Sequence, residues 1–432
     1  MRHERRVPCV VSLAFLLLLV SSLRSPAQDL PTAKPEDVGV SSEKVEELSK
    51  FMQSLVDDGK IAGGVTMMAR HGKVIHLKAV GMADREASKP MRADSIFRIA
   101  SMTKPITSVA IMKLWEEGKL GLDDPVSKFI PEFKNPKVLV SVEPLETRPA
   151  KGEITIRHLL THTSGLTYDD SEKLRSLYTQ HRISGGISST DVTLDQMIKT
   201  LAGLPLLFDP GDNFEYGMST DVLGRVVEVV SGDTLDRFFD KKILAPLGMH
   251  DTSFKVPPDK LDRLAAAYFR AEDGLRKLKD GDIGPIGDTA DYPYNDSHKY
   301  LSGGGGLCST PRDYMRFCQM LLNGGELDGK RLLKKDTIDL MTANHIGTLE
   351  APSLDVIDRF GFGFTAYSSD ERYHKQLRGA YAWFGHWSTS FRISPRGDWV
   401  LVTMAQLSWD EPTPVWFAEY ERIAADSIES PK

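Results

Sequence analysis

Strand-like segments stand near both ends of the chain, and a long helical stretch separates them. Residues 64–69 and 74–80 are mostly apolar runs joined by a polar turn, which predicts a β-hairpin. Further strand patterns return only near the other end, at 361–367, 390–393 and 399–405. We therefore expect strands from both ends to build one sheet, with the segment between them inserted as a separate lobe. A ligand cleft is expected where two such lobes meet.

Helical patterns surround these strands. Apolar residues recur at helical spacing after Ser41 and Ser42, which predicts an amphipathic helix with a serine cap. The middle of the chain carries helical patterns at 106–117, 194–201 and 222–230. A final helix is expected to have Thr413 as its cap and Pro414 at its first position.

These patterns predict an α/β (α+β) fold class. We expect an antiparallel sheet flanked by helices from both chain ends, plus an inserted, mostly helical lobe. The sheet lobe is expected at about residues 28–105 and 300–432, and the helical lobe at about 106–299. With 41% apolar and 26% charged residues, the 432-residue chain is neither collagen-like, nor disordered throughout, nor a multi-span membrane protein.

The first 27 residues have the pattern of a signal peptide. Arg2, Arg5 and Arg6 precede an apolar run at 10–20 that is short for a membrane span. Ser25 and Ala27 then supply the small residues that a signal-peptide cleavage site requires. We expect cleavage after Ala27 and an exported catalytic domain at 28–432, periplasmic or secreted and not stably inserted in a membrane. An uncleaved N-terminal anchor is the alternative. Removing these residues changes the net charge from −6 to −9, which argues against nucleic acid as a partner.

The pattern Ser-x-x-Lys occurs twice, and its context separates the copies. Ser41 precedes an ordinary amphipathic helix, where a serine serves as a cap. Ser101 and Lys104 instead lead into a helix that is apolar nearly all round, as expected for a buried helix. Residues three apart share a helix face and side chains lean toward the N-terminus, so the Lys104 ammonium should reach back to the Ser101 hydroxyl. Locally, Ser101 could also be a plain cap and Lys104 a solvated charge.

Residues 97–106, 156–166, 303–307 and 313–314 together resemble the serine β-lactamase and penicillin-recognising hydrolases, especially the class C β-lactamase-like group and its esterase branch. The resemblance covers about residues 35–408 and implies a β-lactamase/transpeptidase-like fold with Ser101 as nucleophile. The second motif of that family falls on Tyr216, with Met218 in place of its asparagine. The family implies that Tyr216, held near Lys104, takes the Ser101 proton and later activates water.

The third motif of the family has two candidate positions. They are Trp383-Phe384-Gly385 and His386-Trp387-Ser388, and we prefer the first because it ends in glycine. Trp383, Gly385 and His386 would then border the substrate. The backbone N–H groups of Ser101 and His386 would hold the oxyanion.

The remaining motifs favour structural roles. His158 and His162 have the i, i+4 spacing of helical metal ligands, but the glutamate of the zinc motif is absent, so we expect no metal and no cofactor. The glycine run 303–306 lacks the lysine of a phosphate-binding loop. Cys308 and Cys318 are expected to be free thiols.

The sequence thus favours an exported serine hydrolase that works through an acyl-enzyme. Met218 and Trp383 replace the asparagine and lysine that recognise a β-lactam in the family, so a short-chain carboxylic ester is the preferred substrate. Arg378, Arg392 or His386 could restore the missing cation. The alternatives are a class C-type β-lactamase or D-alanyl peptidase acting on peptidoglycan-type substrates, a metal-dependent hydrolase, and a non-catalytic binding protein. The sequence does not indicate an oligomeric state.

Overall fold

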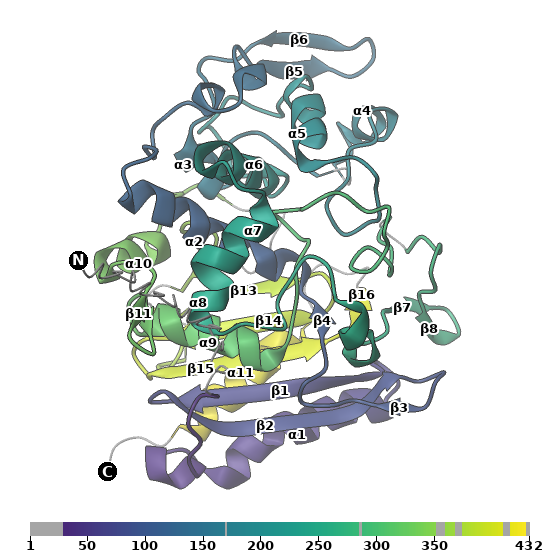
Figure 1. Cartoon of the computed structure of the whole chain (residues 1–432), viewed down its shortest axis with the longest axis vertical. Coiled ribbons are helices and arrows are strands. Elements are labelled where there is room, and N and C mark those ends of the chain that lie inside the picture. The colour runs from purple at the N-terminus through teal and green to yellow at the C-terminus, as the bar shows by residue number, and fades with distance from the viewer. Residues whose placement is uncertain are drawn as a thin grey trace, which may run out of the picture.

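A seven-stranded antiparallel sheet forms one side of the molecule (Figure 1). The computed structural model describes residues 29–168, 171–284, 287–350, 359–367, 374–408 and 415–428. The strands lie in the order β12 (Thr365–Ala366), β13 (Tyr381–Gly385), β14 (Thr389–Ser394), β15 (Trp399–Ala405), β1 (Gly63–Arg70), β2 (Lys73–Asp84) and β3 (Lys89–Pro90). The first four come from the C-terminal part of the chain and the last three from the N-terminal part.

The two chain ends join in the middle of this sheet. β1 pairs with β15 along its whole length, from Gly64 opposite Ala405 to Arg70 opposite Trp399. This pairing confirms that strands from both ends build one sheet. The strand expected at 361–367 is shorter than predicted: only Thr365–Ala366 pairs with β13, and glycines and bends occupy the positions before it.

Two helices cover one face of the sheet. α1 (Ser42–Asp57) and α11 (Trp416–Ser427) bury their apolar sides against a cluster that includes Met68, Trp399 and Leu401 (Figure 1). The Ser41 hydroxyl accepts a hydrogen bond from the Lys44 backbone N–H at 3.3 Å, which confirms the predicted cap. The expected cap of the last helix, Thr413 with Pro414, lies outside the described residues.

The opposite face of the sheet contacts another helix and a turn. α9 (Pro311–Leu322) packs on β1, β14 and β15, and the turn Ala100–Met102 contacts β13 and β14. This turn leads into α2 (Thr103–Glu116), in which every residue from Thr103 to Met112 is buried. The burial confirms that the nearly uniform apolar surface of this helix belongs inside the protein. Thr310 caps α9, because its hydroxyl accepts from the Asp313 N–H at 3.2 Å.

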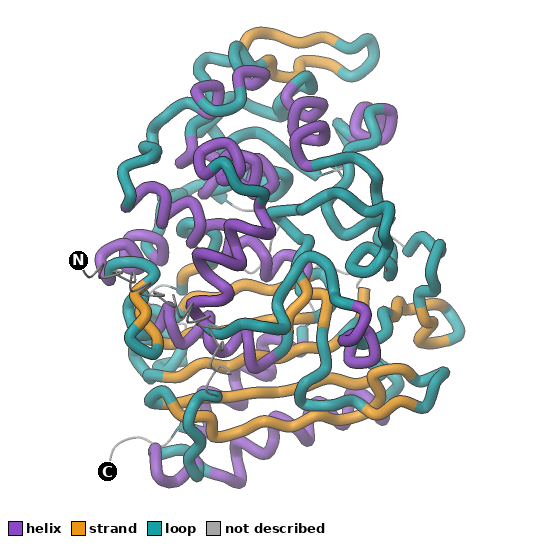
Figure 2. Tube along the Cα trace, viewed as in Figure 1, coloured by secondary structure: helices purple, strands orange, loops and turns teal. Residues whose placement is uncertain are grey.

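The segment between the two strand groups is mainly helix and loop (Figure 2). Its helices, with α10 from the later part of the chain, are α3 (Ile156–Leu160), α4 (Arg175–Gln180), α5 (Leu194–Ala202), α6 (Ser219–Ser231), α7 (Leu235–Phe239), α8 (Ala245–Leu247) and α10 (Lys335–Thr342). Short 3-10 or π-helical turns are η1 (Pro35–Val38), η2 (Ala100–Met102), η3 (Val126–Lys128), η4 (Pro131–Phe133), η5 (Asp240–Leu244) and η6 (Pro258–Arg263).

Small strands also occur outside the main sheet. They are β4 (Phe97–Arg98) with β9 (Cys308–Ser309), β5 (Lys137–Ser141) with β6 (Glu146–Pro149), β7 (Tyr268–Ala271) with β8 (Gly274–Lys277) and β16 (Leu407–Ser408), and β10 (Glu326–Leu327) with β11 (Lys330–Arg331). The β5–β6 and β7–β8 hairpins lie in the region where the sequence predicted only helices and loops. The second strand of each hairpin, β6 or β8, is mostly polar and largely exposed or half-buried, so it lacks the apolar alternation that marks a strand.

Both cysteines that the structure describes, Cys308 and Cys318, are free and buried, as predicted. Within the described ranges, no helix is both long and apolar enough to span a bilayer. The expected signal peptide at 1–27 lies outside those ranges.

Candidate active site

Ser101 lies in a tight turn that leads into α2. The turn is the 3-10 segment η2, and Ala100 within it has φ +41°, a left-handed value that costs free energy for a residue with a side chain. The preceding Ile99 N–H donates to the Leu307 carbonyl at 3.0 Å, and the Tyr314 hydroxyl donates to the Met102 carbonyl at 2.8 Å. Long-range contacts on both sides therefore hold the strained turn.

Lys104 follows one helical turn later and is 1% exposed. Its Nζ donates to the Ser101 Oγ at 3.2 Å, to the Tyr168 hydroxyl at 2.7 Å and to the Gly304 carbonyl at 2.8 Å. The Ser101 contact is the one that the i, i+3 spacing predicts. The other two partners come from segments far away in the sequence.

The environment of Lys104 makes its ammonium easy to deprotonate. Burial lowers the pKa of Lys104 to about 7, and the negative charge of Asp221 opposes this shift. Asp221 is fully buried on α6, and its Oδ1 accepts from Tyr300, Ser302 and the Gly304 N–H at 3.0, 2.6 and 3.3 Å. Burial raises the pKa of Asp221, and the Lys104 charge and the three donors at Oδ1 oppose this shift, so the carboxylate and the lysine favour each other's charged forms.

The glycine run 303–306 brings backbone close to α2 and α6. Thr107 on α2 donates to the Gly303 carbonyl at 2.7 Å, beside the Lys104 contact with Gly304. A Cβ on Gly303 would lie 2.7 Å from the Thr220 carbonyl, and one on Gly304 would lie 2.3 Å from Asp221 Oδ2. Only glycine allows this approach, so the run packs beneath Lys104.

Tyr216 presents the face of its ring to Lys104. The Nζ lies 4.6 Å from the ring centroid, a cation–π geometry. Within the described ranges, the buried Tyr216 hydroxyl makes no hydrogen bond of good geometry. Burial raises the pKa of Tyr216, while the nearby Ser101 and Trp383 side chains act in the lowering direction. The phenol therefore stays protonated at neutral pH.

His162 fixes the backbone on which Tyr216 sits. Its Nδ1 accepts from the Gly217 N–H at 3.3 Å, its ring lies 4.8 Å from the Tyr216 ring, and burial lowers its pKa well below the usual value. His158 takes a different position: its Nδ1 accepts from the Thr155 N–H at 3.2 Å in the capping box of α3. The two histidines thus have separate structural contacts.

The preferred third motif lies beside the Ser101 turn. A Cβ on Gly385, at the end of β13, would lie 2.2 Å from the Ile99 carbonyl, so only glycine allows the strand to approach so closely. Trp383 is 1% exposed, and its ring centroid lies 5.4 Å from that of Tyr216. The His386 Nε2 lies 2.8 Å from Ser408 Oγ and 3.8 Å from Asp288 Oδ2, so its ring faces a polar cluster and not solvent.

Two residues considered for substrate recognition are buried and have structural contacts. Arg392, a suggested replacement for the missing cation, is 4% exposed and is bonded to Glu421 and, at 2.6 Å, to Tyr367. It therefore braces α11 against the sheet, which contradicts the suggested role. Met218 is fully buried at the start of α6.

The structure thus brings Ser101, Lys104 and Tyr216 together, with Trp383, Gly385 and His386 on the neighbouring strand end. Sequence reasoning missed Tyr168, Asp221 and the Gly304 carbonyl as partners of Lys104. Tyr168 lies just beyond the stretch 156–166, and no spacing rule singles it out. Asp221 lies five positions after Tyr216, in the buried first half of α6. An acidic residue at a buried position is rare, and this signal could have identified Asp221 as a candidate site residue.

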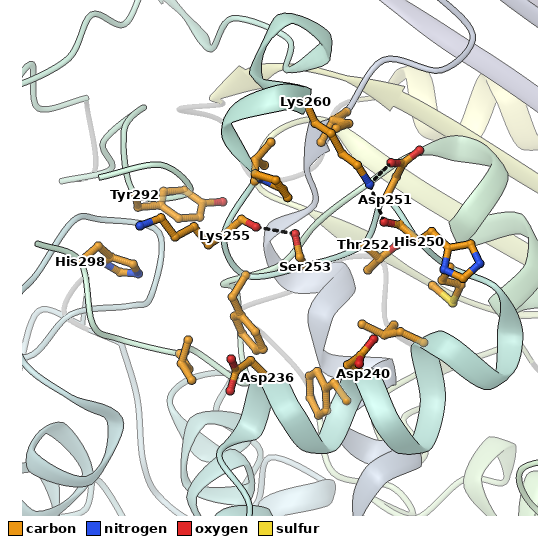
Figure 3. A pocket seen from close by; sticks show the side chains of 18 of the residues that line it. Asp236, Asp240, His250, Asp251, Thr252, Ser253, Lys255, Lys260, Tyr292 and His298 are labelled. Carbon is orange, nitrogen blue, oxygen red and sulfur yellow. Dashed lines mark hydrogen bonds and ion pairs between the residues drawn. The ribbon is translucent and has the colours of Figure 1, made fainter. Parts of the chain in front are cut away.

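A cavity of about 680 Å³ lies outside this cluster (Figure 3). It is bordered by α7, η5 and the loops around Ser253 and Tyr292, and its lining includes none of the six predicted site residues. Its two lysines are already paired, Lys260 with Asp251 at 2.8 Å and Lys255 with Asp296. Among the described residues, no group of three or more His, Cys, Asp and Glu could hold a metal ion. We therefore place the candidate chemistry at Ser101.

Comparisons with known proteins identify the family of the chain. The family described as Beta-lactamase matches residues 48–418. Protein Rv1367c of Mycobacterium tuberculosis is 34% identical over 374 residues, covering 82% of this chain and 88% of its own. Esterase EstB of Burkholderia gladioli is 38% identical over 277 residues, covering 62% and 68% respectively.

A solved structure is similar over nearly the whole fold. EstCE1, described as a hydrolase with promiscuous acyltransferase activity, has a TM-score of 0.75 and 30% sequence identity, covering 90% of this chain and 99% of its own. The predicted β-lactamase/transpeptidase-like fold is therefore confirmed. The chain belongs to the Beta-lactamase family of serine hydrolases, which includes esterases and acyltransferases among its relatives.

Proposed function

We propose that this protein is a carboxylesterase that hydrolyses short-chain esters through an acyl-enzyme on Ser101. The observation that carries the proposal is the buried Lys104, whose Nζ lies 3.2 Å from the Ser101 Oγ and whose pKa is lowered to about 7. Such a lysine is neutral in a large share of molecules near pH 7 and can accept the serine proton.

In the acylation step, the Ser101 Oγ attacks the ester carbonyl carbon and its proton passes to the neutral Lys104. The backbone N–H groups of Ser101 and His386 hold the oxyanion of the tetrahedral intermediate. The carbon–oxygen bond to the alcohol then breaks. The alcohol leaves with the proton that Lys104 took from Ser101.

Deacylation repeats these steps with water as the nucleophile. Water gives a proton to Lys104 as its oxygen attacks the acyl carbon. The bond between that carbon and the Ser101 Oγ then breaks, Lys104 returns the proton to Oγ, and the carboxylic acid leaves. The pKa directions favour Lys104 over Tyr216 as the group that takes the proton, because burial raises the pKa of the phenol. The role of Tyr216 as base thus stays a prediction.

The environment of the site favours an ester over a β-lactam. A β-lactam carries a carboxylate, and each charge-assisted hydrogen bond that it lacks costs about 1.5 to 3 kcal/mol. At the two motif positions, Met218 and Trp383 are buried and offer no charge, and Arg392 is bound to Glu421. The name of Esterase EstB supports ester chemistry in a relative of this chain.

Two measurements test this proposal. In the first, mass spectrometry after exposure to an activated ester should find the acyl group on Ser101. Ser101→Ala should abolish turnover, a loss of several kcal/mol of transition-state stabilisation. Ser41→Ala, in the other Ser-x-x-Lys copy, should leave turnover unchanged and cost about 1 kcal/mol of stability at most. Full activity of Ser101→Ala would exclude the mechanism.

The second measurement compares kcat/KM for a p-nitrophenyl short-chain ester and a chromogenic cephalosporin. We expect the ester to give the higher value. A higher value for the cephalosporin would replace the esterase proposal with the β-lactamase alternative and leave the role of Ser101 intact.

We also propose that the protein is exported, on the basis of the arginines and the apolar run in its first 27 residues. The mature chain should begin at Gln28, in the periplasm or outside the cell. Mass spectrometry of the intact protein from its own cells tests this; a chain that still begins at Met1 would contradict it.

A further inference from the structure

The number of donors on Lys104 matches the number of acceptors around it. A protonated lysine has three N–H donors. Within the described part of the chain, Nζ has three hydrogen-bond partners, which are Ser101 Oγ, the Tyr168 hydroxyl and the Gly304 carbonyl. Tyr168 gives the shortest of these contacts, at 2.7 Å. Two partners therefore hold the amine, and the third position belongs to the nucleophile.

The two tyrosines beside Lys104 are not equivalent. Tyr216 meets the amine with its ring face, 4.6 Å from the centroid, and its hydroxyl lies toward Ser101 and Trp383. Tyr168 meets the amine with its oxygen, and its ring packs edge-on against Tyr216 with centroids 5.6 Å apart. Only Tyr168 directs a phenol oxygen at Nζ within hydrogen-bonding distance.

This contact matters when the proton moves. As Ser101 gives its proton to Lys104, a positive charge forms at a buried nitrogen, which is costly unless every N–H finds an acceptor. The Gly304 carbonyl can only accept, and it is fixed in the glycine run. Tyr168 completes the set, because its oxygen accepts the remaining N–H and keeps Nζ beside Ser101.

We propose that Tyr168 is a positioning residue of the catalytic base: its hydroxyl holds the Lys104 amine against Ser101 and stabilises the ammonium that forms during acylation. The inference rests on the proposed function and extends it to a residue outside the three sequence motifs. Tyr168 is half-buried, so its ring also forms part of the wall beside the nucleophile.

The test is Tyr168→Phe, which removes one oxygen and keeps the ring. We expect the acylation rate, measured as the pre-steady-state burst with a p-nitrophenyl ester, to fall tenfold or more, while KM changes less than twofold. The ammonium also loses an acceptor. The acid limb of the pH profile of kcat/KM should therefore move to lower pH.

Tyr420→Phe is the matched control. Tyr420 is likewise a buried tyrosine, its hydroxyl has no hydrogen-bond partner in the described part of the chain, and it lies on α11 beyond the opposite face of the sheet. This variant should keep the parent rate and pH profile. Thermal unfolding checks that both variants fold, and Tyr168→Leu replaces Tyr168→Phe if the latter does not.

The outcomes separate this inference from the proposed function. Parent-like burst rate and pH profile in Tyr168→Phe would overturn the positioning role, as would a loss confined to KM, which indicates a substrate contact. In either case, an inactive Ser101→Ala would leave the esterase mechanism standing. An active Ser101→Ala would refute both.

Discussion

The charge of a single residue, Asp221, shifts the pH range in which the proposed base works. Lys104 must be neutral to accept a proton, so activity should rise with pH through its pKa, which lies at about 7. Asp221 favours the ammonium and raises that pKa against the larger effect of burial. Asp221→Asn should therefore lower the pKa of Lys104 and move the acid limb of kcat/KM to lower pH, as a pH–rate profile would show.

Asp313→Asn is the control for this prediction. Asp313 is also buried, and burial raises its pKa to about 6, but it accepts hydrogen bonds from Asp251 and Thr252 beside α9. Its variant should keep the acid limb of the parent. An unchanged limb in Asp221→Asn would mean that Asp221 does not act on Lys104 through its charge.

At the same scale, the sequence predicts local contacts better than distant ones. The Ser101–Lys104 contact follows from the geometry of one helix, and the structure contains it at 3.2 Å. Tyr168 and Gly304 reach Lys104 from loops that are 64 and 200 positions away, and no periodicity in one sequence specifies such an approach. The same limit applies to Arg392, whose partner Glu421 lies on a different element.

At the scale of elements, the glycine run acts as a spacer between α2 and α6. Gly304→Ala would place a Cβ 2.3 Å from Asp221 Oδ2, and three hydrogen bonds prevent that carboxylate from moving away. The loop must shift instead and carry the Gly304 carbonyl away from Lys104. We expect kcat/KM to fall by about tenfold or more, with the loss mainly in kcat.

Gly203→Ala provides the comparison for that variant. Gly203 ends α5 with φ −79°, and its nearest contact for an added Cβ is the Thr200 carbonyl at 3.4 Å. Its kcat/KM should equal that of the parent. If Gly304→Ala behaved in the same way, the run would not control the position of Lys104.

Helices and strands with a regular apolar pattern could be predicted from the sequence, and those made mainly of polar residues could not. The hairpin of β1 and β2, the buried α2 and the caps at Ser41 and Thr310 follow from hydrophobic spacing and capping chemistry. The β5–β6 hairpin has an exposed second strand, so its pairing depends on backbone contacts that composition does not reveal. The length of β12 was overestimated because the apolar residues just before it are buried without pairing to a neighbouring strand.

At the scale of the whole molecule, a buried histidine links stability to pH. His76 on β2 is 6% exposed, its Nε2 lies 2.7 Å from Thr66 Oγ1, and burial lowers its pKa to about 4. In the unfolded chain this histidine binds its proton near pH 6.5. Its contribution to the free energy of unfolding is therefore fully present above that pH and is lost as the pH falls toward 4. Between pH 7.5 and 5, this histidine should reduce the free energy of unfolding by about 2 kcal/mol.

Urea unfolding at both pH values checks this effect. His76→Gln keeps a hydrogen-bonding side chain that does not titrate, so its stability should change less with pH than that of the parent. His181→Gln, at an exposed position, should show the pH dependence of the parent. Equal pH dependence in His76→Gln and the parent would remove His76 as the cause.

The union of the two chain ends in one sheet has a consequence during protein synthesis. Arg70 on β1 pairs with Trp399 on β15, about 330 positions later. At the usual rates of translation, β1 and β2 would wait on the order of 15 to 70 s for that partner. Throughout this time the β1 edge is open to pairing with another strand. Until the last strands are made, this edge avoids mispairing only while another chain segment or a chaperone covers it.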